Sequence, residues 1–154
     1  MKKLFILFMA LVIILGITAC GSTNQTSETA VETEGTKSMK MNVKIGDRSF
    51  IATLEDNVAT RELIEMMEEA PISISMSDYS GFEKVGSLGR SLPTDNQETT
   101  TSAGDIVLYN GNNIVMFYGS NSWSYTRIGK IDNLSDWEEA LGSGSITAVF
   151  TLAK

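Results

Sequence analysis

Histidine and cysteine, which take part in many enzyme mechanisms, are nearly missing from this sequence of 154 residues. It contains no histidine and a single cysteine, Cys20. Without histidine, the chain lacks the commonest metal ligand and the commonest general base. One cysteine forms neither an internal disulfide nor a cysteine-based zinc site. These absences argue against most hydrolase and metalloenzyme mechanisms. No Gly-x-Gly-x-x-Gly opens a helix after a strand either, so we expect no metal and no cofactor.

A second group of residues is suited to binding a ligand. Tyr79, Tyr118, Trp123 and Tyr125 lie close to glycine, serine and asparagine, a composition typical of recognition surfaces. The alternative is that these aromatic side chains complete the hydrophobic core of a small domain.

The charge balance argues against one class of partner. The formal net charge is −7, and residues 39–154 contain 9 Lys and Arg against 16 Asp and Glu, with no basic cluster. Because phosphate binding needs a concentrated basic surface, we expect no nucleic-acid partner.

The first 20 residues are typical of an exported protein. A start with two lysines precedes an uninterrupted apolar run over residues 4–15. This run is shorter than an ordinary transmembrane helix and has the length of the hydrophobic part of a signal peptide. The next residues, Ile17-Thr18-Ala19-Cys20, resemble the lipobox of bacterial lipoproteins. That resemblance implies that residues 1–19 are a signal peptide and that the Cys20 sulfur receives a diacylglyceryl group.

Lipidation would place the protein on a membrane, since two or more acyl chains make anchoring stable. We therefore expect Cys20 to be a lipid attachment point on the extracytoplasmic side of the cell membrane, with the lipid bilayer as a partner. Residues 21–38 are polar except for Ala30 and Val31, which predicts that residues 20–38 form a lipidated, disordered tether. The folded domain is then residues 39–154.

Hydrophobic periodicity predicts about seven strands and two short helices in this domain. One helix is expected over residues 59–70, ended by a proline, and another over residues 134–141. Asn110-Gly111-Asn112 between two apolar runs is a strong hairpin signal. Residues 81–104 show little periodicity and are expected to form a long loop. The expected strands are residues 41–45, 50–54, 72–76, 105–109, 113–118, 124–131 and 146–152.

Antiparallel hairpins dominate this pattern, and closing a sheet on itself removes its exposed edges. We therefore predict a mainly β fold, a small closed barrel flanked by two short α-helices.

Two segments resemble the bacterial cyclophilin-like family. They are GDIVLY at residues 104–109, continuing to FYG at 117–119, and WSYTR at 123–127. FEKVG at 82–86, with LG at 88–89 and LP at 92–93, extends the match. The resemblance covers about residues 41–152 and implies a closed cyclophilin-like β-barrel.

Cyclophilins are peptidyl-prolyl isomerases that seat a proline ring in an apolar pocket and use an arginine to polarise the amide. Their aromatic-His-Arg and Gln-Gly-Gly motifs are absent here, so no catalytic arginine can be assigned by motif. Arg90 and Arg127 are the candidate substitutes. The candidate pocket residues are Tyr79, Phe82, Arg90, Tyr118, Trp123, Tyr125 and Arg127.

Three functions remain open at this point. The first is a non-catalytic binding or accessory module, with an exported peptide or protein as a candidate partner. The second is a divergent peptidyl-prolyl isomerase acting on exported proteins. The third comes from the resemblance alone, because relatives joined to flavodoxin-type domains suggest an accessory role beside a redox partner.

Overall fold

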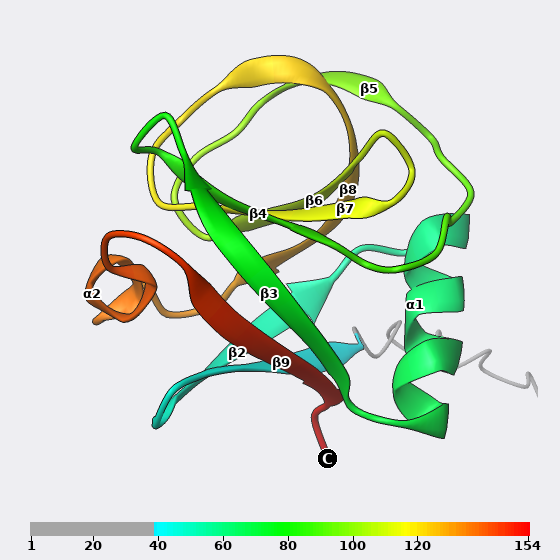
Figure 1. The fold of residues 1–154 in the computed structure, drawn as a ribbon. Coiled ribbons are helices and arrows are strands. Elements are labelled where there is room, and N and C mark those ends of the chain that lie inside the picture. Colours follow the sequence, from blue (N-terminus) through cyan, green and yellow to red (C-terminus); the bar gives the residue numbers. More distant parts are fainter. Residues whose placement is uncertain (1–38) are drawn as a thin grey trace, which may run out of the picture. The chain divides into compact units, whose positions relative to one another are not determined.

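The computed structural model describes residues 39–154 (Figure 1). The predicted signal peptide, the lipidated Cys20 and the tether lie outside the described residues. No helix within residues 39–154 is long and apolar enough to cross a membrane. The elements in chain order are β1 (Lys40–Ile45), β2 (Arg48–Leu54), α1 (Val58–Glu69), β3 (Ile72–Tyr79), β4 (Glu83–Ser87), β5 (Gln97–Thr100), β6 (Asp105–Tyr109), β7 (Asn113–Phe117), β8 (Ser122–Ile131), α2 (Trp137–Leu141) and β9 (Ile146–Leu152).

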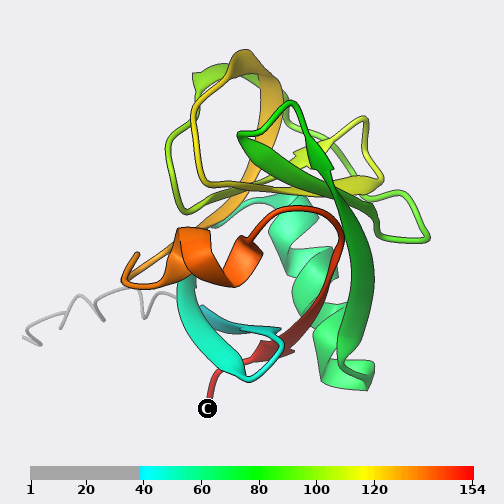
Figure 2. The same ribbon diagram turned by 60° about the vertical axis from the view of Figure 1, so that its left-hand side comes forward.

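Eight of the strands form a closed antiparallel barrel. They are hydrogen-bonded in the order β2-β1-β9-β3-β4-β7-β6-β8, and β8 pairs again with β2 to close the ring. The ninth strand, β5, pairs with the first half of β8. Figures 1 and 2 show α1 and α2 on opposite sides of the barrel. The predicted fold class, a small closed barrel with two helices, is therefore confirmed.

The helices close the barrel with the side chains that the periodicity selected. In α1, Ala59, Leu63 and Met67 are buried, and the Asn57 side chain caps the helix by accepting from the Thr60 amide at 2.9 Å. Such a cap satisfies one of the free amides at the start of a helix. In α2, Trp137 is buried and its indole N–H donates to the Phe117 carbonyl at 2.8 Å.

The barrel closes where β8 crosses the end of β2, and a glycine makes this crossing possible. Gly129 pairs with Leu54 on one side and with Ile106 on the other. A Cβ atom at this position would lie 2.5 Å from the Thr53 carbonyl oxygen. Because backbone atoms cannot move aside as a side chain can, the closure requires glycine here.

The expected loop over residues 81–104 is wrong, because it contains β4 and β5. In β4, a charged pair and a glycine hide the strand pattern, and burial comes from pairing with β3 and β7. In β5, the sequence Gln-Glu-Thr-Thr has no apolar residue and pairs with β8. The second helix also begins later than expected, at Trp137, and Leu134 stays 43% exposed.

The central strands β6 and β7 are buried on both faces, as their apolar composition predicts. Their inward side chains, such as Ile106 and Met116, belong to the barrel core. Their outward side chains Val107, Val115 and Phe117 pack with Tyr125 of β8 into a second cluster, the outer cluster. The arch made by β5 and the first half of β8 lies over this outer face in Figures 1 and 2. This arrangement leaves room for a site between the arch and the barrel wall.

Candidate functional site

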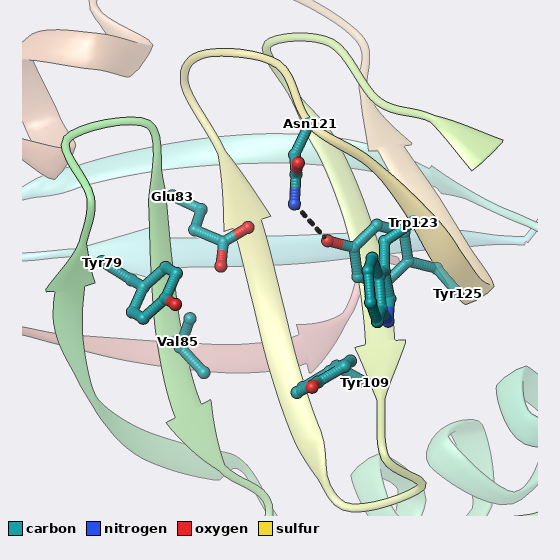
Figure 3. Close-up of a pocket in the computed structure, with 7 residues that line it drawn as sticks. All are labelled: Tyr79, Glu83, Val85, Tyr109, Asn121, Trp123 and Tyr125. Atoms are coloured by element: carbon teal, nitrogen blue, oxygen red, sulfur yellow. Dashed lines mark hydrogen bonds between the residues drawn. The ribbon is translucent and has the colours of Figure 1, made fainter. Parts of the chain in front are cut away.

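A pocket of about 420 Å³ opens on the outer face of the barrel (Figure 3). Its size is within the range of small-molecule sites. Aromatic and apolar side chains dominate its lining, together with one acid and one amide. The lining residues are Tyr79, Glu83, Val85, Tyr109, Asn121, Trp123 and Tyr125.

Strand register explains why these side chains share one face. Tyr79 of β3 is paired with Glu83 of β4, and Glu83 is paired in turn with Phe117 of β7. Val85 lies two residues further along β4, and Tyr109 ends β6. Directly paired residues, and residues two apart on one strand, point to the same side of a sheet. The pocket wall is therefore continuous with the outer cluster.

A tight turn between β3 and β4 places one side of the pocket. Ser80 and Gly81 both have positive φ, 52° and 75°, and the Phe82 amide donates to the Tyr79 carbonyl at 3.3 Å. Two positive φ values in succession are typical of a type I′ hairpin turn, which matches the twist of the strands. The turn lets the Phe82 ring meet the Tyr79 ring edge-on, with centroids 6.2 Å apart. Tyr79 stays 59% exposed at the pocket rim.

The opposite side of the pocket is held by Asn121 and Tyr125. The Asn121 carbonyl accepts from the Thr101 amide at 2.8 Å, and the Asn121 amide donates to the Thr101 hydroxyl oxygen at 3.0 Å. Its side-chain amide donates to the Tyr125 hydroxyl oxygen at 2.9 Å, and its side-chain oxygen accepts from the Ser122 amide. The Tyr125 hydroxyl accepts in this bond, so its own hydrogen can be donated to a ligand. Burial raises the pKa of Tyr125, which keeps that hydroxyl protonated.

Two further aromatic rings complete the walls. Trp123 is 58% exposed and is held by the pairing of β8 with β5, where it faces Thr99. Tyr109 packs edge-on against Tyr125, with centroids 6.1 Å apart. Figure 3 shows Tyr79 on one side of the pocket, Trp123 and Tyr125 on the other, and Tyr109 near one end.

Glu83 is the unusual member of this lining. Its residue is only 6% exposed, and its Oε2 atom has no hydrogen-bond partner within residues 39–154. Burial raises the pKa of the Glu83 carboxyl to about 7, well above its ordinary value. None of the described Lys or Arg side chains lines the pocket. Glu83 is therefore a buried acceptor without a protein cation beside it.

The next residue along β4, Lys84, points to the opposite face and is fully buried. Its ammonium group donates to Asp78 Oδ1 at 2.8 Å and to the carbonyls of Gly142 and Gly144 at 2.9 and 2.8 Å. The Tyr118 hydroxyl also donates to Asp78. These bonds, from Lys84 first and then from Tyr118, lower the pKa of Asp78. Lys84 is thus already paired and is not available to Glu83.

The structure brings some of the predicted site residues together and separates others. Tyr79, Trp123 and Tyr125 line the pocket, and Phe82 packs behind Tyr79. The other three predicted residues lie elsewhere.

Tyr118 belongs to the group around Asp78. Arg90 is exposed in the segment between β4 and β5. Arg127 lies 3.8 Å from the buried carboxylate of Asp105 and lines a neighbouring acidic groove, which includes Glu55 and Asp95 and shares Tyr125 with the outer-face pocket. No arginine among the described residues therefore faces the pocket.

Four lining residues were missed from the sequence: Glu83, Val85, Tyr109 and Asn121. The apolar composition of residues 105–109 on both parities, which predicts a covered outer face, could have indicated Tyr109. Nothing local indicates Glu83, since its burial comes from pairing with β7. Within residues 39–154 no group of three or more His, Cys, Asp or Glu is placed to hold a metal ion.

Comparisons with known proteins agree with this architecture. The solution structure of a hypothetical protein from Archaeoglobus fulgidus superposes with a TM-score of 0.56 at 14% identity, covering 75% of this chain and 95% of that one. At this identity the similarity shows the fold alone. A search among curated proteins gave no match. The model of the cyclophilin-like family matches residues 43–151, which is most of the sequence, and the chain therefore belongs to the cyclophilin-like family.

Proposed function

We propose that this protein is a membrane-anchored extracytoplasmic lipoprotein whose cyclophilin-like domain is a binding module and not an enzyme. The observation that carries the binding role is the outer-face pocket, which is lined by four aromatic rings and contains a buried acceptor without a partner. A pocket of this kind offers contact area and a few fixed polar groups, which is what small-ligand sites share.

The composition of the lining argues against isomerase chemistry. Twisting a prolyl amide has an uncatalysed barrier of about 18–20 kcal/mol, and a cyclophilin lowers it with an arginine held over that amide. The two candidate arginines, Arg90 and Arg127, do not line the described pocket. The ionisable group that does line it, Glu83, is an acceptor when charged. An acceptor cannot stabilise electron density on a carbonyl oxygen in the way a guanidinium does.

The binding role is tested with Trp123, whose exposed ring at the pocket makes it a reporter. Full-length protein in a mild detergent is titrated with a set of small aromatic compounds, and tryptophan fluorescence is recorded. We expect saturable changes that disappear in Trp123→Phe, because the other tryptophan, Trp137, is buried away from solvent.

The same protein is assayed for X-Pro isomerisation in a short peptide. We expect no acceleration. Clear catalysis, or fluorescence changes that persist in Trp123→Phe, would contradict the proposed function.

The anchoring part of the proposal is tested by Cys20→Ala in the bacterial cell. The substitution removes the sulfur that a diacylglyceryl group would occupy, so the protein should move from the membrane fraction to a soluble or unprocessed form. Fractionation followed by immunoblotting measures this change. Ser22→Ala is the control, because it alters the same segment without removing the sulfur. Equal membrane association of Cys20→Ala and the parent would contradict lipid anchoring.

A further inference from the structure

The outer-face pocket has a chemical preference that its lining defines. We propose that it takes a small organic cation that carries N–H groups on an aromatic or apolar body, with Glu83 as the counter-ion. This inference rests on the proposed binding function and names the ligand class of that same site.

The first support is the free acceptor. Glu83 is 6% exposed and its Oε2 atom has no partner within the described residues. A buried acceptor without a partner is unfavourable, and buried polar groups in folded proteins are nearly always hydrogen-bonded. In Figure 3 the carboxyl group of Glu83 projects toward the space between Tyr79 and Asn121. A ligand N–H placed there would supply the missing bond, and a charged N–H would do so most strongly.

The second support is the aromatic lining. Tyr79, Tyr109, Trp123 and Tyr125 surround the pocket, and the faces of such rings attract cations. The two rim rings, Tyr79 and Trp123, are more than half exposed, so they can close on a ligand without opening the core. An anionic ligand would instead meet a carboxyl group and no described basic side chain.

The third support is that nothing in the surroundings already neutralises Glu83. The titratable side chains that line the pocket with Glu83 are phenols, namely Tyr79, Tyr109 and Tyr125, and the pKa of Tyr118, raised mainly by burial, is raised further by the charge of Glu83. Lys84, the nearest cation along the chain, is bonded on the other face to Asp78 and two carbonyls. The positive charge that would stabilise an ionised Glu83 must therefore come from the ligand.

The test compares three probes of similar size on the full chain by isothermal titration calorimetry at pH 7.5. Benzamidinium is a cation with N–H groups, benzamide has N–H groups without the charge, and benzyltrimethylammonium has the charge without N–H groups. We expect benzamidinium to bind at least ten times more tightly than either of the others. A fourth probe, a blocked arginine amide, presents the same chemistry on a peptide side chain. Comparing its affinity with that of benzamidinium tells whether the pocket prefers a free small molecule or an arginine side chain of a peptide.

Variants assign the preference to Glu83. Glu83→Gln should lower the affinity for benzamidinium at least tenfold and change the affinity for benzamide by less than about twofold. The reason is that the glutamine side chain keeps the shape of glutamate and removes its charge. The matched control is Glu68→Gln on the exposed face of α1, which removes the same charge far from the pocket lining and should change neither probe.

The affinity for benzamidinium should also rise by about tenfold per pH unit between pH 5 and 7 and then level off, as expected when binding requires an ionised group. Glu83→Gln should remove this dependence.

Each result supports or overturns a defined part of the proposal. Equal binding of benzamide and benzamidinium would overturn the cation preference while leaving the binding function in place. Equal weakening by Glu68→Gln would overturn the role of Glu83. Failure of every probe to bind would overturn both the ligand class and the proposed function.

Discussion

Lys84→Met should lower the free energy of unfolding by about 2 kcal/mol, because hydrogen bonds made by a charged group contribute about 1.5–3 kcal/mol. The Lys84 ammonium is fully buried and makes three hydrogen bonds, to Asp78, Gly142 and Gly144. Methionine fills the same volume but donates no hydrogen bond. The Asp78 carboxylate and two carbonyls would lose their donor together, and β4 would lose its link to the segment between α2 and β9.

Urea unfolding of the full chain measures this effect. Lys40→Met is the matched control, because Lys40 pairs with Asp132 at 2.8 Å while both side chains are more than a third exposed. Exposed pairs contribute below about 1 kcal/mol, so the control should cost far less. A double variant, Lys84→Met with Asp78→Asn, should recover part of the loss by removing the unpaired charge. Equal losses of unfolding free energy in Lys84→Met and Lys40→Met would show that the burial of Lys84 does not increase its contribution to stability.

Glu83→Gln should change how stability depends on pH. Burial raises the pKa of Glu83 from an ordinary 4.5 to about 7 in the folded chain. Between these pH values the folded state keeps a proton that the unfolded state has lost. The contribution of Glu83 to the free energy of unfolding is therefore largest below pH 4.5, falls as the pH rises toward 7, and is constant above pH 7. A shift of this size corresponds to about 3 kcal/mol.

The glutamine variant does not titrate, so its stability relative to the parent should rise by about this amount between pH 4.5 and 7. Other carboxyl groups act in the opposite direction, because hydrogen bonds lower the pKa values of Asp78 and Asp132, and stability from them is lost in acid. Subtracting the parent from the variant removes their contribution. Urea unfolding at half-unit pH steps gives the difference, with Glu68→Gln as a control that should stay flat. A flat difference for Glu83→Gln would mean that water reaches the carboxyl group freely.

Local features of the fold could be read from the sequence because they depend on neighbouring residues. The α1 helix follows from its apolar spacing and its Asn57 cap. The hairpin of β6 and β7 follows from the three-residue loop 110–112 between the paired residues Tyr109 and Asn113. Asn110 and Gly111 in this loop adopt positive φ, 51° and 74°, which asparagine and glycine accept most readily. The apolar composition of those two strands on both parities also predicted that both of their faces are covered.

Only the tertiary structure decided which residues form the site. Tyr79, Glu83, Tyr109 and Tyr125 come from four strands, β3, β4, β6 and β8, and meet on one outer face because of register and closure. The burial of Glu83 arises from β7, more than 25 residues away along the chain, so no nearby pattern marks it. The same pairing separates Arg90, Tyr118 and Arg127 from the pocket, although their residue types suit a binding site. Composition and local spacing determined α1, the β6–β7 hairpin and the strands outside residues 81–104. Contacts between distant strands decided where β4 and β5 form, which side chains share a cavity and which acid is left without a partner.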